Sequence, residues 1–237
     1  MHRVRIALSL MSLALLTPGR GLCEDAIQIL HKVGQTYRNL KSYHFEGTTV
    51  AETRSAGAKS TSETEFIIAY AAPNKFRVEF RYPNAGSWIR VSDGRTLSRY
   101  RSITNELKQD VVATDNLDIL HGTLVAGFED VDQGVKKATM LDSDVVNIGG
   151  SNGHKIDCYV VEVEREQPHM LVGTEPLPEK LWIDKTRFIV VRRIVGTKSV
   201  AQSADHRTEN IRTTTFSVAA INAPLEDNLF ALNAGRK

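Results

Sequence analysis

The chain has 237 residues, enough for one sizeable hydrophobic core, and no linker or internal repeat divides it. With 30 basic and 28 acidic residues its net charge is +2, so bulk electrostatics implies neither a nucleic acid nor an anionic membrane surface as a partner.

The first residues predict export. Met1–Arg5 is a basic segment, Ile6–Leu16 is an apolar run, and Thr17–Gly19 breaks that run. Because the run is too short to cross a bilayer as a helix, residues 1–23 are interpreted as a signal peptide. Cleavage before Glu24 would release a soluble periplasmic or secreted protein.

A second form remains open, in which Cys23 is the acylated cysteine of a bacterial lipoprotein. Arg20 and Leu22 fit poorly where such a signal carries an aliphatic and a small residue, so the soluble form is preferred. In the soluble form Cys158 is the only cysteine, which permits no internal disulfide. Its place in an alternating strand pattern predicts a small core residue rather than a nucleophile.

We expect the exported protein to begin near Glu24 and to carry no acyl group, because the basic and apolar segments match an ordinary signal peptide. Intact mass and N-terminal sequencing measure both properties. A diacylglyceryl adduct on Cys23 would contradict the soluble assignment.

Hydrophobic periodicity in the first half predicts a helix followed by a β meander. Apolar residues at helical spacing are Ile27, Leu30, Val33, Tyr37 and Leu40. The expected strands are Tyr43–Val50, Phe66–Tyr70, Phe76–Tyr82, Trp88–Ser92, Thr96–Arg101 and Glu106–Val112, with a loop or a long hairpin turn over Arg54–Ser62. In Phe76–Tyr82 apolar and charged residues alternate strictly, which indicates an antiparallel sheet with one solvated face. Asp93-Gly94 is a strong hairpin signal.

In the second half a helical insertion precedes another meander. Asp115 or Asn116 can cap a helix whose apolar stripe runs from Leu117 to Phe128. The strands expected after it are Val145–Ile148, Lys155–Glu164, Lys180–Asp184, Phe188–Val195 and Glu209–Val218. Several strands are apolar on both faces, which predicts a sheet curved around helices or around a ligand cavity.

Four short motifs in this order resemble the periplasmic lipoprotein carrier and its relatives, the LolA-like lipoprotein-sorting superfamily. They are Pro73-Asn74-x-Phe76, Val91-Ser92-Asp93-Gly94-x-Thr96-Leu97, Leu181-Trp182-Ile183-Asp184 and the closing Asn222–Phe230 segment. The chain departs from the carrier at Ala72, where the carrier has an arginine, and at Ser98, where an aromatic residue is common.

The resemblance implies a mainly β (α+β) fold. Residues 24–237 would form a single lipid-binding domain, a strongly curved antiparallel incomplete β-barrel with an N-terminal helix and the Leu117–Phe128 helix as a lid. It also implies an apolar cavity for acyl chains. The residues expected to line that cavity are Phe66, Phe76, Phe80, Trp88, Leu124 and Phe128.

No catalytic apparatus is recognisable. No histidine pair has metal-ligand spacing, the glycine-rich turn Gly149–Gly153 lacks the helix and lysine of a phosphate loop, and no Gly-x-Ser-x-Gly occurs. We therefore expect a protein that is not an enzyme and has no cofactor or metal. Arg187, Arg192 and Arg193 are either solvated strand-edge charges or a docking patch for an acidic partner.

Two functions remain. The first is a carrier that holds a lipid or an acylated lipoprotein in the apolar cavity, and the second is an envelope sensor on the same scaffold that binds a membrane-protein partner. A monomer and no nucleic acid are expected in either case. A large apolar pocket favours the carrier, and a fully packed interior favours the sensor.

Overall fold

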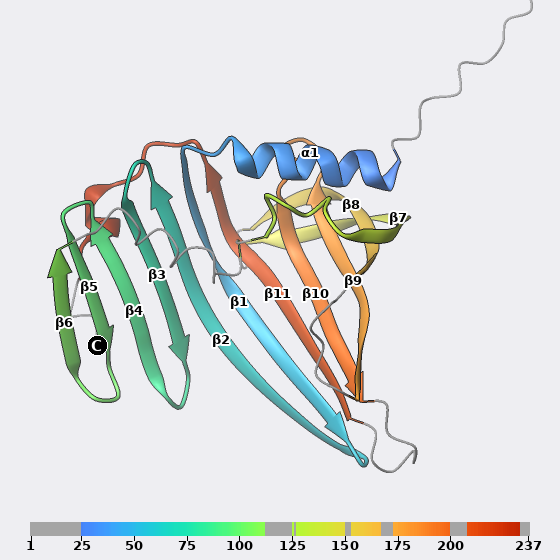
Figure 1. The fold of residues 1–237 in the computed structure, drawn as a ribbon, viewed down its shortest axis with the longest axis horizontal. Helices are drawn as coiled ribbons and strands as arrows, with labels where there is room; N and C mark the ends of the chain where they lie inside the picture. Colours follow the sequence, from blue (N-terminus) through green and yellow to red (C-terminus); the bar gives the residue numbers. More distant parts are fainter. Residues whose placement is uncertain are drawn as a thin grey trace, which may run out of the picture.

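The computed structural model describes residues 25–111, 125, 127–149, 153–166, 173–199 and 208–232. The predicted signal peptide, residues 1–23, and most of the predicted lid helix, including Leu124, lie outside these ranges. Within them the chain forms one α-helix and an 11-stranded antiparallel sheet (Figure 1). No helix in the described ranges is long and apolar enough to cross a membrane.

The elements follow the predicted order of helix, meander and second meander. They are α1 (Ala26–Arg38), β1 (Ser42–Ser55), β2 (Ala58–Ala71), β3 (Lys75–Tyr82), β4 (Gly86–Asp93), β5 (Thr96–Arg101), β6 (Glu106–Val111), β7 (Val135–Ile148), β8 (His154–Arg165), β9 (Thr174–Asp184), β10 (Val190–Ser199), β11 (Thr208–Ile221) and the 3-10 helix η4 (Asp227–Phe230).

The strand order shows how the two meanders join. It runs β6-β5-β4-β3-β2-β1-β11-β10-β9-β8-β7, so each meander extends outward from a central pair formed by β1 and β11. This central pairing is antiparallel and runs from Tyr43–Ile221 to Ser55–Thr208, with one irregularity at Glu46/Gly47. The first and last long strands of the chain therefore hold the two halves together.

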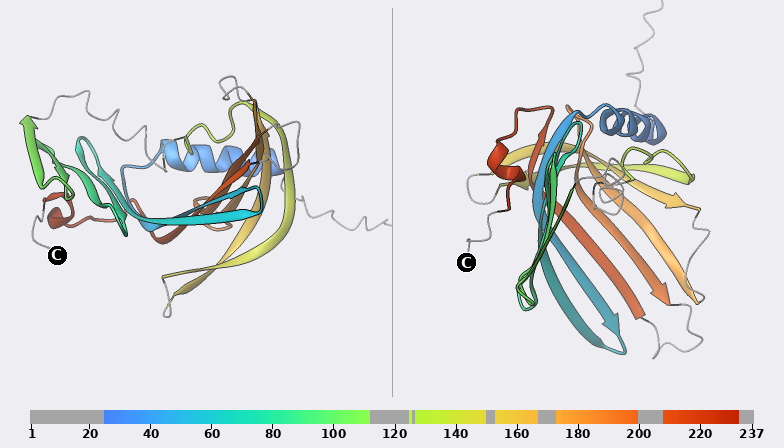
Figure 2. Two further views of the ribbon diagram at one scale, coloured as in Figure 1. Left: turned by 90° about the horizontal axis from the view of Figure 1, so that it is seen from below. Right: turned by 60° about the vertical axis from the view of Figure 1, so that its left-hand side comes forward.

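The sheet is open, because its outer strands β6 and β7 lie at opposite ends of the strand order. The expected mainly β chain with an N-terminal helix is confirmed. The expected barrel is not, since the sheet neither closes nor curls strongly (Figure 2). In β2, which is apolar on both faces, the two faces have different covers: Ile68 packs in the core under α1, and Ala69 packs against Phe230 of η4 on the other side.

We call the side of the sheet under α1 the helix face. Asp25 caps α1 by accepting a hydrogen bond from the Ile27 N–H at 3.3 Å, and the predicted amphipathic helix is confirmed. The buried stripe consists of Ala26, Ile29, Leu30, Val33, Gly34 and Tyr37. Ile27, which was expected in this stripe, is exposed. The Tyr37 hydroxyl accepts a hydrogen bond from the Val190 N–H at 3.2 Å, and burial raises its pKa.

Three phenylalanines from β1, β2 and β11 form the centre of the helix-face core. Phe45 and Phe66 each meet the ring of Phe216 edge-on, at 5.4 Å between ring centroids. Gly47 makes this packing possible. A Cβ at Gly47 would lie 2.7 Å from Cζ of Phe66 and 2.1 Å from the carbonyl oxygen of Thr215, so any larger residue would displace the ring or the β11 backbone.

The other side of the sheet is covered by residues 225–232, which we call the C-terminal strap. Phe230 is buried there against Ala69, Ile89 and Val91 of β2 and β4. The strap lies on the side away from α1 (Figure 2). It covers part of the face that strand alternation predicted to be solvated, and we call this side the strap face.

Two of the motifs that carried the family resemblance have a structural role. The Asn74 side chain donates a hydrogen bond to the Gly94 carbonyl at 2.9 Å, and the Ser92 hydroxyl donates to the Asn74 carbonyl at 2.9 Å. The Asp93 carboxylate accepts from the backbone N–H groups of residues 95 and 96, both at 2.8 Å, and these bonds lower its pKa. The Pro-Asn and Ser-Asp-Gly turns are therefore tied together at one end of the sheet.

The predicted lid can be followed only at its C-terminal end. Residues 127–134 are turns, so the helix expected to reach Phe128 does not include it. This segment is anchored to the rest of the core. Arg165 donates to the carbonyls of Val131 at 2.7 Å and Gln133 at 2.8 Å, and Asp132 pairs with His31 of α1 at 2.8 Å.

Candidate ligand-binding surface

Three of the six predicted cavity residues lie in one row across the sheet. Phe66 on β2 is opposite Phe80 on β3, and Phe80 is opposite Trp88 on β4. Residues opposite each other in register share a face, so all three belong to the helix face. Phe76 lies on the same face, opposite Ser92. Leu124 lies outside the described residues.

The row changes from buried to accessible along its length. Phe66, Phe76 and Phe128 are each no more than 2% exposed, and Phe128 packs on the ring of Tyr37 at 5.1 Å. These three rings are part of a filled interior. Phe80 and Trp88 are only partly buried and stack on each other at 5.9 Å between centroids. This pair is the accessible aromatic part of the predicted set.

Figure 1 shows why the pair differs from its neighbours. Helix α1 runs from β1 over the β11–β9 half of the sheet and does not reach over β3–β6. We call β3–β6 the wing. Its strap face is covered in part by the C-terminal strap, over β3 and β4, while no described helix or strand lies over its helix face.

Three arginines that sequence analysis did not select surround the aromatic pair. Arg90 follows Trp88 by two residues on β4, and its guanidinium lies 4.5 Å from the indole ring centroid. On β5, Arg99 is opposite Arg90 and Arg101 is opposite Trp88. The available signal was the spacing of Trp88-x-Arg90 and Arg99-x-Arg101 on either side of the Asp93-Gly94 turn, which fixes this register.

The predicted basic patch of Arg187, Arg192 and Arg193 is not brought together as one surface. Arg192 and Arg193 are adjacent on a strand and point to opposite faces. Arg192 lies over the ring of Trp182 at 5.5 Å, and Arg193 pairs with Glu179 at 2.6 Å. Arg187 is also engaged inside the chain, pairing with the carboxylate of residue 184 at 2.7 Å.

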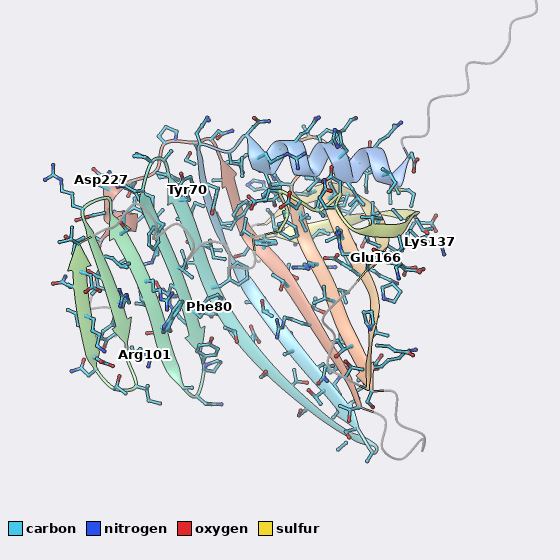
Figure 3. All side chains as sticks on the ribbon, viewed as in Figure 1. Tyr70, Phe80, Arg101, Lys137, Glu166 and Asp227 are labelled. Atoms are coloured by element: carbon cyan, nitrogen blue, oxygen red, sulfur yellow. The ribbon has the colours of Figure 1, made fainter. Side chains whose placement is uncertain are left out.

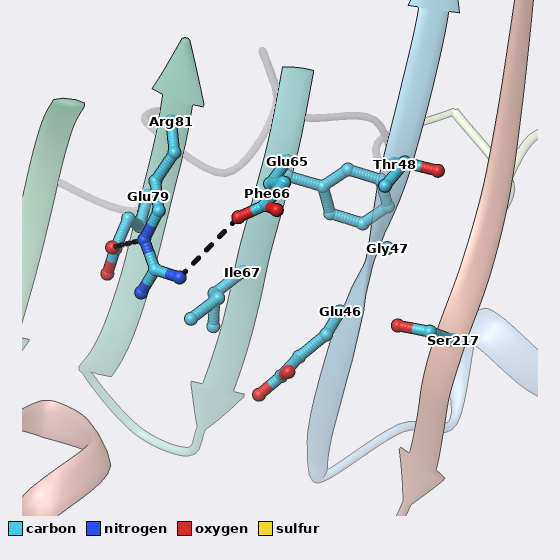
Figure 4. A pocket seen from close by; sticks show the side chains of 9 residues that line it. All are labelled: Glu46, Gly47, Thr48, Glu65, Phe66, Ile67, Glu79, Arg81 and Ser217. Atoms are coloured by element: carbon cyan, nitrogen blue, oxygen red, sulfur yellow. Dashed lines mark hydrogen bonds and ion pairs between the residues drawn. The ribbon is translucent and has the colours of Figure 1, made fainter. Parts of the chain in front are cut away.

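Two pockets are lined by described residues. One, of about 230 Å³, includes Glu46, Glu65, Glu79 and Arg81, and Arg81 pairs with Glu79 at 2.6 Å and with Glu65 at 3.7 Å (Figure 4). The other, of about 310 Å³, lies beside Arg165, Glu179 and Arg193. Both are lined by ion pairs as well as apolar atoms, and neither is the apolar chamber that was expected.

Cys158 is fully buried, as its strand pattern predicted. Burial raises the pKa of its thiol to about 11, so the thiolate needed of a nucleophile is scarce at neutral pH. Within the described ranges no three His, Cys, Asp or Glu side chains are grouped as metal ligands would be.

Comparison with known proteins gives a likeness of structure at low identity. No protein-family model and no curated protein matches the sequence. MucB is 15% identical with a TM-score of 0.46, and the match covers 88% of this chain and 63% of MucB. A LolA superfamily protein from Nitrosomonas europaea is 13% identical with a TM-score of 0.32, covering 89% of this chain and 99% of that one.

A DUF1329 family protein from Desulfovibrio piger is 10% identical with a TM-score of 0.35, covering 89% of this chain and 98% of that one. The chain is thus structurally similar to LolA superfamily, MucB and DUF1329 proteins at low sequence identity, and the first of these is the superfamily that its four motifs resemble.

Proposed function

We propose that this chain is a non-enzymatic, periplasmic binding protein that holds an acyl chain, free or as part of an acylated lipoprotein, on the helix face of its wing. The single observation that supports this is the Phe80–Trp88 pair. Its two stacked rings are accessible at the margin of the core, where α1 ends and no other described helix or strand covers the sheet.

The driving force would be the burial of methylene groups, each contributing about 0.8 kcal/mol. A single long chain could then bind usefully after the entropic cost of association. Because Phe66, Phe76 and Phe128 are packed inside the protein, they would not contact the ligand; Phe66 and Phe76 would flank the surface on the same face of the sheet. The proposed binding site is therefore a surface formed by two aromatic residues, Phe80 and Trp88, in place of the expected cavity.

Uptake of a fluorescent fatty acid tests the proposal. Delipidated wild-type protein should take up the probe saturably, and an apolar competitor should displace it. The double variant Phe80→Ala/Trp88→Ala should bind about tenfold or more weakly, because each ring contributes its apolar contact area. Far-UV circular dichroism should stay unchanged, since the wing's strands keep their pairing.

Val145→Ala is the control, because Val145 is an exposed apolar residue of β7, at the opposite end of the sheet from the wing. It should bind like wild type. If delipidated wild-type protein takes up no acyl chain of any length, the carrier proposal fails.

A specific observation favours the sensor as the second candidate. Strand β6 is an edge of the sheet, and its Leu107 and Val111 side chains are 49% and 86% exposed. An exposed edge strand can pair with an extended segment of another chain through its free backbone groups. The packed interior of the described residues also favours the sensor over a carrier with an internal cavity, whereas the Phe80–Trp88 surface favours a carrier that binds its ligand on the sheet. If delipidated wild-type protein takes up no fatty acid, the sensor becomes the preferred function.

A further inference from the structure

Arg90 has an unusual position for an arginine of a β-sheet, because it lies on an inner strand opposite another arginine. Arg90 lies on β4, an inner strand, and Arg99 is directly opposite it on β5. Like charges directly opposite each other destabilise a strand pair. Arg101 adds a third positive charge diagonally across the same two strands.

The hydrogen bonding of Arg90 is incomplete. Its Nε atom is buried and has no hydrogen-bond partner. Its contact among the described residues is the stack of the guanidinium on the Trp88 ring. Desolvation, together with the charges of Arg99 and Arg101, lowers the pKa of Arg90. A buried donor without a partner is costly and calls for an explanation.

The carboxylates of the neighbouring edge strand do not supply the missing charge. On β6, Asp110 pairs with Arg99 at 2.6 Å and Glu106 pairs with Lys108 at 2.9 Å. Among the described residues, Arg90 and Arg101 form no ion pair. Arg101 lies opposite Glu106, whose pKa is lowered by Lys108 and also by Arg101. Arg90 is therefore the positive charge without a described counterion on the helix face of the wing, beside the partly buried rings of Phe80 and Trp88. Figure 3 shows Phe80 and Arg101 on this part of the sheet.

A role in solubility does not explain these features. Arginines that protect a sheet from aggregation belong on its edge strands and point into water. Arg90 is on an inner strand, and part of its guanidinium is withdrawn from solvent. Opposed positive charges and a buried donor without a partner destabilise the folded chain. Where no other group of the protein offsets such a cost, the feature is typical of a binding site.

We propose that Arg90, stacked on Trp88, and Arg101, opposite Trp88 on β5, bind an oxyanion of the phosphate type, and that this anion is the headgroup of the amphiphile held at Phe80 and Trp88. The inference rests on the proposed function, and it adds the charge of the ligand. The planar guanidinium of arginine matches phosphate oxygens with two parallel hydrogen bonds, which would satisfy the Arg90 Nε donor. The apolar chain would leave the headgroup along the aromatic row toward β3.

Three probes separate the headgroup from the chain: dodecyl phosphate, dodecyl maltoside and inorganic phosphate, the first two used below their micelle concentrations. Titration calorimetry on the delipidated protein should give tighter binding for dodecyl phosphate than for dodecyl maltoside. Arg90→Gln and Arg101→Gln should each weaken dodecyl phosphate binding about tenfold, the expected loss of one charged hydrogen-bonding partner. Binding of dodecyl maltoside should change less than twofold, about the uncertainty of such a comparison.

Arg95→Gln is the control, since it removes the same charge from an exposed residue of the β4–β5 turn. It should leave the binding of both dodecyl ligands unchanged. The thermal midpoint of Arg90→Gln gives an independent readout. If Arg90 serves ligand binding and not stability, the thermal midpoint of Arg90→Gln should equal or exceed that of wild type, because the variant removes a desolvated charge that lies opposite another positive charge. A lower midpoint would assign Arg90 a structural role and overturn the inference.

The outcomes separate the two proposals. Binding of both dodecyl ligands with equal affinity, unchanged in Arg90→Gln, overturns the anion site and leaves the acyl proposal standing. Binding of inorganic phosphate that is lost in Arg90→Gln, without binding of dodecyl maltoside, supports the anion site with a free anion as its source. Absence of binding for all three probes overturns both.

Discussion

Replacing Phe66 by alanine is expected to lower the free energy of unfolding by about 3–5 kcal/mol, as large-to-small changes of buried aromatic residues do. Phe66 is almost fully buried, and its ring meets Phe216 edge-on at 5.4 Å. The cavity left behind cannot collapse easily, because Gly47 already lies against the ring and the β11 backbone lies against Gly47. Urea denaturation followed by circular dichroism measures the loss as a shift of the midpoint.

Phe80→Ala is the matched comparison, since Phe80 is directly opposite Phe66 in register and is only partly buried. It should cost about 1–2 kcal/mol, because less apolar area is removed from the protein interior. The two variants should also differ in function, with acyl binding reduced in Phe80→Ala and retained in folded Phe66→Ala protein. Equal losses of stability would mean that Phe80 belongs to the packed core, and would remove it from the proposed surface.

Local sequence patterns predicted most of the individual elements. The alternation over Phe76–Tyr82 corresponds to β3, and the Asp93-Gly94 turn joins β4 to β5 as expected. Both signals depend on residues close in the chain. Of the two alternatives expected over Arg54–Ser62, a loop or a long hairpin turn, the structure has a hairpin, in which β1 and β2 continue through these polar residues to a two-residue turn at Ala56-Gly57, where φ is positive at both positions. Tertiary pairing on either side extends strands that have little β pattern of their own.

Long-range contacts explain what the sequence did not reveal. Alternation predicted that Arg77 and Glu79 would be solvated, yet both are buried, because the C-terminal strap lies over them. No pattern within β3 indicates that residues about 150 positions later cover this face. The candidate site also depends in part on contacts that local sequence patterns do not reveal. The aromatic rings were found from their alternation, whereas the arginines beside them required the register of β4 and β5.

Glu79→Gln is expected to have the second large effect on stability. The Glu79 side chain is 4% exposed and accepts hydrogen bonds from Nε of Arg77 at 2.8 Å and Nε of Arg81 at 2.6 Å. Arg77 in turn donates to the strap carbonyls of Leu229 at 3.2 Å and Ala231 at 3.1 Å. The carboxylate therefore positions the guanidinium that attaches the strap to the sheet.

A neutral amide at residue 79 would leave the charge of Arg77 buried without a counterion, which costs about 3–5 kcal/mol for pairs of this kind. The double variant Arg77→Met/Glu79→Leu should be clearly less destabilised, because it removes both charges together and keeps apolar volume under Phe230. Denaturant midpoints of the two variants provide the comparison, and proteolysis of the strap should accelerate in Glu79→Gln. The double variant could instead lose as much stability as Glu79→Gln. That result would mean that the hydrogen bonds from Arg77 to the strap carbonyls, and not the pairing of its buried charge, account for the stabilisation.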